Sequence, residues 1–143
     1  MPSTARSLRK MATVITNDGL HTGDQFGTRG VIDRLDLCAI AYIVAEDCPA
    51  PAEFFTDEGA SIALIEASQP AMELIRAISA HLDFSPPHIN GTPQYIDHVS
   101  NWARTTGIGE TEPPTTTDVI GRLLRTADAL TDTLARFPHQ RAA

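Results

Sequence analysis

The chain of 143 residues is 42% hydrophobic and 20% charged, which is the size and composition of one ordinary globular domain. Its longest uninterrupted apolar run covers nine residues, Leu37 to Ala45, about half of the ~20 that a membrane-spanning helix needs. The formal charge of −7 argues against nucleic-acid binding, which depends on clustered basic residues. We therefore expect neither a membrane nor a nucleic acid among the partners.

Two features bear on the compartment. The N-terminal stretch has basic residues but no apolar segment followed by a cleavage site, so it does not read as a secretory signal. Two lone cysteines, Cys38 and Cys48, are typical of free thiols in a reducing compartment. We expect a cytoplasmic protein with a single domain over 1–143, its core over about 7–137 and flexible ends at 1–6 and 138–143.

The first predicted element is a helix over about 7–17. Ser7 is the expected N-cap and Gly19 lies just past the C-terminal end. The apolar residues recur with helical spacing at Leu8, Met11, Ala12 and Ile15. The β-branched run at 13–16 would also suit a strand, and this alternative remains open.

The connector that follows, His21 to Gly30, reads HTGDQFGTRG. Its glycines are spaced G-x-x-x-G-x-x-G without a lysine, and a helix rather than a strand is expected before it, so it matches neither phosphate-binding fingerprint. Glycine clusters between elements are usually turns. We predict a surface loop, or a short β-turn or hairpin at 20–31.

A second helix is predicted from a cap at Asp33 to about Glu46. Its residues are apolar on nearly every side, which places it at the centre of the fold. A buried strand over CAIAYIV is the alternative. Two further helices are predicted over about 56–68, capped by Thr56, and over 70–82.

The remaining chain divides into a loop at 83–93, a helix at about 93–104, a linker at 105–116 and a terminal helix at 117–136. Pro86-Pro87 and Asn90-Gly91 are both turn formers within the loop. The prediction is an all-α fold, a compact bundle of five or six helices.

The most specific polar group lies on the 93–104 helix. Asp97, His98, Asn101 and Arg104 are spaced so that they share one helical face, opposite a core face that includes Trp102. Such a face is usually solvated, but it could line a cleft. His21 and Arg29 of the preceding connector are the residues that would close it, which makes these six the candidate ligand-binding residues.

Metal binding and nucleophilic catalysis find little support in the sequence. His81, Asp83, His88 and His98 include metal-ligand types but lack ligand spacing, so we expect no metal site. Neither a nucleophile elbow nor a cysteine with a neighbouring histidine is present. No cofactor is expected, and the catalytic residues, if any exist, are unknown.

Negative charge is concentrated in the middle of the chain. Between residues 46 and 83 eight acidic residues stand against one basic residue, Arg76; the acids are Glu46, Asp47, Glu53, Asp57, Glu58, Glu66, Glu73 and Asp83. A basic partner protein, or solubility alone, accounts for such a surface.

Four segments then suggest a family: LRKMATVITNDG, DRLDLCAIAYIVAE, IDHVSNWAR and PPTTTDVIGRLLRTADAL. Their order resembles that of domain of unknown function 6197, a family of small actinobacterial proteins, over about residues 7–130. The resemblance implies the same order of helices and an actinobacterial source, but no activity, cofactor or catalytic residue. In that family the tryptophan tends to precede an Asn-Asp pair, whereas here Asn101 precedes Trp102, so no role of such a pair can be transferred.

Together these features predict a small binding or regulatory protein that acts through protein contacts or self-association, with the acidic 46–83 region as the contact surface. The alternative is a small enzyme or ligand-binding protein with a polar cleft at the 95–104 helix. We favour the first, so catalysis is not the leading expectation.

Overall fold

The computed structural model describes residues 3–105 and 112–136, with side chains up to residue 132. Within this part the chain forms seven helices and two short hairpins, in agreement with the predicted all-α class. The helices are α1 (Thr4–Asp18), α2 (Leu37–Glu46), α3 (Glu53–Thr56), α4 (Glu58–Ala67), α5 (Gln69–Ala80), α6 (Tyr95–Arg104) and α7 (Thr116–Arg136). None of the helices in the described residues is long and apolar enough to cross a membrane.

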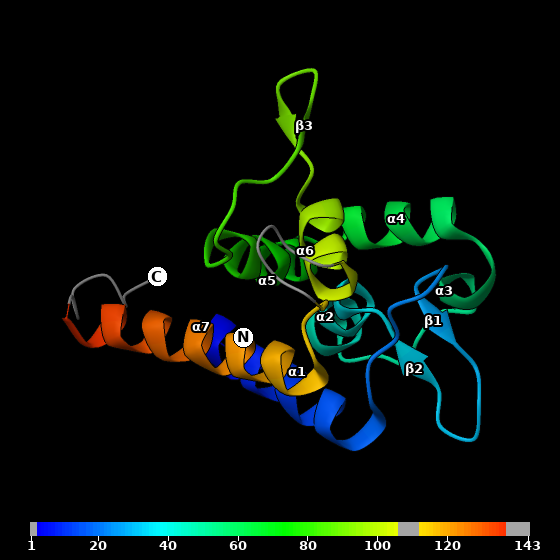
Figure 1. Cartoon of the computed structure of the whole chain (residues 1–143), viewed down its shortest axis with the longest axis horizontal. Coiled ribbons are helices and arrows are strands. Elements are labelled where there is room, and N and C mark those ends of the chain that lie inside the picture. Colours follow the sequence, from blue (N-terminus) through cyan, green and yellow to red (C-terminus); the bar gives the residue numbers. More distant parts are fainter. Residues whose placement is uncertain (1–2, 106–111, 137–143) are drawn as a thin grey trace.

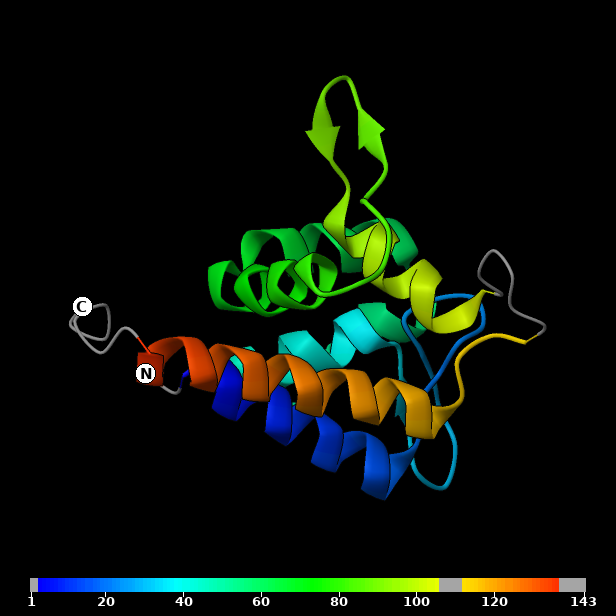
Figure 2. The same ribbon diagram turned by 60° about the vertical axis from the view of Figure 1, so that its left-hand side comes forward.

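The helices are arranged around α2. Helices α1 and α7 lie side by side and antiparallel along one side of the molecule, and α4, α5 and α6 cover the other side (Figures 1 and 2). Residues 37–41 at the start of α2 have no exposed surface, because α1, α5 and α6 all pack against this helix. The prediction that this apolar helix lies at the centre of the fold is therefore confirmed.

The apolar stripes of the other helices also form the core. The four stripe residues expected in α1 are all buried, as are Val119, Leu123 and Ala127 of α7. Leu124 of α7, by contrast, is 40% exposed.

The first hairpin pairs β1 (Gly27–Thr28) with β2 (Arg34–Leu35) in antiparallel register, Gly27 opposite Leu35. It lies further along the chain than the predicted 20–31. The prediction that Asp33 caps α2 is also wrong. The Asp33 carboxylate accepts a hydrogen bond from the Gly30 amide within the hairpin loop (3.2 Å). Asp36 caps α2 instead, accepting from the Cys38 amide at 2.8 Å.

Two other helices also begin at a different residue from the one predicted, because another side chain caps each of them. Ser3, not Ser7, caps α1 by accepting from the Arg6 amide (3.1 Å), so residues 4–6 are helical and not a flexible end. Asp57, not Thr56, caps α4. Thr56 is the last residue of α3, a helix of four residues that the sequence analysis missed and that raises the number above five or six. The expected flexible end at 138–143 lies outside the described residues.

A second hairpin lies in the segment predicted as a loop. Strands β3 (His88–Ile89) and β4 (Thr92–Pro93) are joined by Asn90 and Gly91, both with positive φ (51° and 80°). Two such residues between paired strands form the tight turn that the Asn-Gly dipeptide favours. We call residues 84–94 the arm, because the hairpin projects away from the helical body (Figures 1 and 2).

Candidate functional site

The connector between α1 and α2 does fold back onto α6, as the cleft hypothesis requires. The Arg104 guanidinium donates to the Gly23 carbonyl oxygen at 3.5 Å, the long end of the hydrogen-bond range. The same guanidinium donates twice to Asn101 Oδ1, at 3.2 and 3.0 Å. Arg104, Asn101 and the connector therefore meet at the C-terminal end of α6, on the exposed surface.

His21 is occupied in holding the connector together. Its Nε2 lies 2.6 Å from the Asp24 carbonyl oxygen and its Nδ1 lies 2.7 Å from Thr28 Oγ1. A carbonyl only accepts, so Nε2 carries the proton and, in the neutral ring, Nδ1 accepts from the threonine hydroxyl. Both ring nitrogens are thus used inside the loop and neither faces a ligand.

Arg29 is turned away from α6. Its guanidinium lies 4.1 Å from the centre of the Phe55 ring and 3.5 Å from the Asp33 carboxylate. The hypothesis that Arg29 closes a cleft over α6 is therefore wrong; it fixes the first hairpin against α3 instead.

The predicted polar face of α6 is divided. Asp97, Asn101 and Arg104 are exposed, whereas His98 is only 1% exposed and points into the core. Its Nδ1 lies 2.6 Å from Ser79 Oγ of α5, and the Phe84 ring packs edge-on against it with centroids 4.5 Å apart. His98 is excluded from any surface site because α5 and the root of the arm cover it.

Ser79 and His98 resemble a nucleophile and its base, but their burial excludes that role. Ser79 is 4% exposed, so a substrate has no access to its hydroxyl. Burial lowers the pKa of His98, which keeps the ring neutral, and Nε2 has no hydrogen-bond partner among the described residues. The pair is a buried polar contact between α5 and α6.

A second buried polar cluster joins α2 to α6. Asp36 Oδ2 accepts from the Cys38 amide and from Ser100 Oγ, at 2.8 and 2.9 Å, and Ser100 Oγ lies 3.3 Å from Cys38 Sγ. Burial raises the pKa of Asp36, while the hydrogen bonds from Cys38 and Ser100 and the positive charge of Arg104 oppose the rise. The sequence carried one signal for this cluster: Asp36 stands directly before the apolar helix, where an N-cap is expected.

Cys38 is not a reactive thiol in this environment. It has no exposed surface, and burial together with the nearby Asp36 carboxylate raises its pKa well above the ordinary value. The nucleophile in thiol chemistry is the thiolate, so a thiol held protonated in the core is inert. The Asp36, Ser100 and Cys38 cluster is therefore structural.

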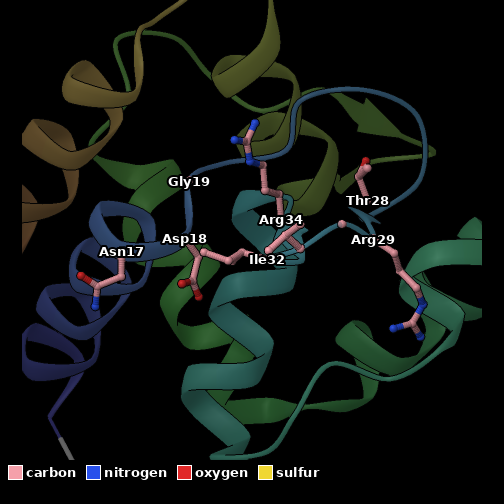
Figure 3. Close-up of a pocket in the computed structure, with 9 residues that line it drawn as sticks. Asn17, Asp18, Gly19, Thr28, Arg29, Ile32 and Arg34 are labelled. Atoms are coloured by element: carbon pink, nitrogen blue, oxygen red, sulfur yellow. The ribbon is translucent and has the colours of Figure 1, made fainter.

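An open groove of about 510 Å³ lies between the C-terminal end of α1 and the first hairpin. Nine residues line it: Asn17, Asp18, Gly19, Thr28, Arg29, Gly30, Val31, Ile32 and Arg34. The charged groups do not converge, because the Asp18 carboxylate, the Arg29 guanidinium and the Arg34 guanidinium point in three different directions (Figure 3). Small-molecule sites depend on a few convergent polar groups, so this groove is better suited to an apolar side chain.

Two of the candidate metal ligands, His81 and His88, interact with nearby backbone carbonyl oxygens. His81 Nδ1 donates to the Ala77 carbonyl oxygen (2.9 Å) and His88 Nδ1 lies 3.1 Å from the Pro86 carbonyl oxygen. Over residues 3–105 and 112–136 the structure contains no group of three or more potential metal ligands.

No protein-family model, curated protein or solved structure matches the chain. The resemblance to domain of unknown function 6197 therefore stays a prediction.

Proposed function

We propose that this protein binds another protein through its two hairpins. The observation that carries the proposal is the distribution of large apolar side chains that stay exposed. Five are found in the described residues, and four of them belong to the hairpins: Val31 (108%) and Ile32 (55%) in the first, Phe84 (52%) and Ile89 (58%) in the arm. Burying these side chains against a partner would remove them from water, which favours association.

The acidic 46–83 region would attract a basic partner over a distance. Within the described residues Glu58, Glu66 and Glu73, on the outer helices α4 and α5, are exposed and make no ion pair. Asp47 and Asp83 at the two ends of the region are already engaged, with Lys10 (3.8 Å) and Arg122 (3.4 Å). Charges of one sign speed association and select partners more than they add affinity.

The alternative, a small enzyme or ligand-binding protein at α6, has one observation in its favour. Arg104 brings the connector onto Asn101 and so forms a polar surface at the end of that helix. With His98 buried, Arg29 turned away and both ring nitrogens of His21 used within the connector, however, the cleft lacks three of its six predicted members. Protein binding is the better supported function, and we place it in the cytoplasm.

Capture from a lysate of the source organism tests the proposal. We expect wild-type protein to retain specific proteins that Val31→Asp loses, because the new carboxylate would have to be desolvated in the contact. Leu124→Asp is the matched control, since it introduces the same group at an exposed apolar position outside both hairpins. Equal capture by all three proteins would contradict the proposal.

The same assay distinguishes a direct contact through the hairpins from long-range electrostatic attraction by the acidic helices. Reversing the charges of Glu58, Glu66 and Glu73 to lysine is expected to slow capture at low salt while leaving it intact at high salt, where screening removes the attraction. Complete loss of capture at every salt concentration would instead make the acidic helices the contact surface.

A further inference from the structure

The tip of the arm is an asparagine followed by a glycine. Asn90 and Gly91 are both exposed and form the turn between β3 and β4. Among the described residues, neither the Asn90 carboxamide nor the Gly91 amide has a hydrogen-bond partner. Apart from the neighbours in the chain, no atom lies within 4 Å of the point where a side chain on Gly91 would begin. Both groups are therefore open to water and free of competing hydrogen bonds.

An asparagine that precedes a glycine can lose its side-chain amide without an enzyme. The glycine nitrogen gives its proton to a base and attacks the side-chain carbonyl carbon, and the new C–N bond closes a cyclic imide as ammonia leaves with a proton from solvent. Water then opens the imide at either carbonyl. The product is aspartate or isoaspartate, in which the main chain runs through the former side chain. Glycine favours the attack because it has no side chain to hinder it.

The closed turn opposes this reaction. Positive φ at both residues of a two-residue loop, 51° at Asn90 and 80° at Gly91, is typical of the type I′ turn, in which Asn90 is left-handed. In that conformation the Asn90 side chain and the Gly91 nitrogen lie on opposite sides of the bond between Cα and the carbonyl carbon. The nitrogen reaches the side chain only after this bond rotates, so the turn has to open first.

The arm is held closed by few contacts. Each of its strands is two residues long. At its base the Gln94 amide donates to the Pro87 carbonyl oxygen (2.8 Å), but Pro87 has no amide hydrogen with which to return the bond. Pro93 in β4 lacks that hydrogen too. The hairpin projects from the helical body (Figure 2), and a lone two-stranded hairpin is marginally stable in water. Opening of the turn is therefore frequent on the scale of a slow covalent reaction.

The two other asparagines of the chain are held in helices. Asn17 lies in α1 and Asn101 in α6, where the regular helix fixes the backbone on both sides of the residue. Asn101 Oδ1 also accepts two hydrogen bonds from Arg104. We propose that Asn90 is the deamidation site of this protein and that opening of the arm sets the rate of the reaction.

Deamidation changes the arm in two ways. From Phe84 to Ile96 the sequence contains no Asp, Glu, Lys or Arg, so a carboxylate at position 90 is the first charge in this segment. It lies next to Ile89, which is 58% exposed. Isoaspartate also lengthens the main chain within the turn, which disturbs the pairing of β3 with β4. Under the proposed function, on which this consequence rests, the new charge has to be desolvated in the contact and weakens it.

The modification is tested by incubating the full chain for weeks at slightly alkaline pH, followed by peptide mapping with mass spectrometry. We expect the fragment that contains Asn90 to gain the mass difference between amide and acid, with isoaspartate among the products. Asn17 and Asn101 should keep their amides. The reaction at Asn90 should be faster in urea that unfolds the chain, and Asn90→Gln should abolish it.

Thr92→Gly tests the part played by arm opening. Glycine weakens a strand, so the rate at Asn90 should rise about twofold to fivefold. Thr22→Gly is the matched control, because Thr22 is exposed and lies in the connector, outside the arm. Circular dichroism and thermal melting show that both variants are folded.

Three results would overturn the inference. One is an Asn90 that keeps its amide in the folded chain while it reacts in urea. The second is a faster reaction at Asn17 or Asn101 of the folded chain. The third is an equal rate at Asn90 in Thr92→Gly and Thr22→Gly. Each of these rates is measured without a partner, so it does not depend on the proposed function.

The effect on binding is measured with the capture assay. Asn90→Asp carries one of the two products and keeps a dipeptide, Asp-Gly, that favours the same turn. We expect it to lose the proteins that Val31→Asp loses. If Val31→Asp loses them and Asn90→Asp retains them, the effect on binding is overturned and the proposed function stands. If neither variant loses them, the proposed function fails together with this effect.

Discussion

The junction of α2 with α6 and the pair of hairpins reverse the usual placement of polar and apolar groups. At the junction the carboxylate of Asp36 and the hydroxyl of Ser100 are buried, and on the α5 side of α6 the imidazole of His98 is buried as well. At the hairpins Val31, Ile32, Phe84 and Ile89 are exposed. The contrast shows that polarity alone does not locate a functional site: here the buried polar groups hold helices together, and the exposed apolar groups are the ones free to bind.

Replacement of the buried carboxylate is expected to have the largest effect on stability. Asp36→Ala removes the N-cap of α2 and leaves the buried Ser100 hydroxyl without its acceptor. We expect a loss of about 3 kcal/mol, combining a cap with an unsatisfied buried group. Urea unfolding measures it, with Asp97→Ala as the control, because Asp97 is exposed. Equal losses for the two variants would mean that the junction is not a stabilising cluster.

The next largest effect concerns pH. Burial lowers the pKa of His98 below its ordinary value of 6.5, so as pH falls the unfolded chain takes up a proton that the folded chain does not. The contribution of His98 to stability is therefore full above about pH 6.5 and falls below it, by up to about 1.4 kcal/mol per pH unit.

Unfolding measured at pH 7.5 and pH 5.5 tests this expectation. His98→Gln should flatten the decrease in stability, while His88→Gln, at an exposed position, should leave it unchanged. If the slopes of wild type and His98→Gln coincide, His98 is not the group that titrates.

A smaller effect is expected where the connector meets α6. Arg104→Ala removes an exposed contact with the Gly23 carbonyl oxygen and should cost about 0.5 kcal/mol. Hydrogen exchange should rise locally in the connector and not in α2. If amides throughout the core lost their protection from hydrogen exchange, the contact between Arg104 and Gly23 would be shown to stabilise the whole fold and not only the connector.

The smallest effect on stability is expected in the arm. Ile89→Asp replaces a side chain that packs against little else, so the free energy of unfolding should change by less than about 0.5 kcal/mol. Thermal melting measures it. A loss comparable to that of Asp36→Ala would show that the arm belongs to the stabilised core, and the contrast between the two regions would disappear.

The sequence predicted the helices well where an apolar stripe repeats over several turns. The stripe of α1 and the all-round apolar surface of α2 were interpreted correctly, because helical spacing is a property of the local sequence. Helix starts were predicted less well. Ser7, Asp33 and Thr56 are all residues that can cap a helix, but the residues that do so are Ser3, Asp36 and Asp57.

The candidate site was predicted only in part. Arg104, Asn101 and the connector do meet, whereas His98 is buried and Arg29 stacks on Phe55. Helical spacing places residues 97, 98, 101 and 104 near one another, but it does not say which of them faces α5. The second hairpin was missed although its Asn-Gly turn was noted, because two-residue strands have too little alternation to be recognised.

By itself, then, the sequence determined the helical class, the central position of α2 and the neutrality of the segment from Phe84 to Ile96, since each depends on residue type and local spacing. Only the tertiary structure decided that Asp36 lies against Ser100, that His98 is sealed by Ser79 and Phe84, and that Ile32 and Ile89 are left in solvent. These contacts join elements far apart in the chain, and which face of an element is covered depends on what packs against it.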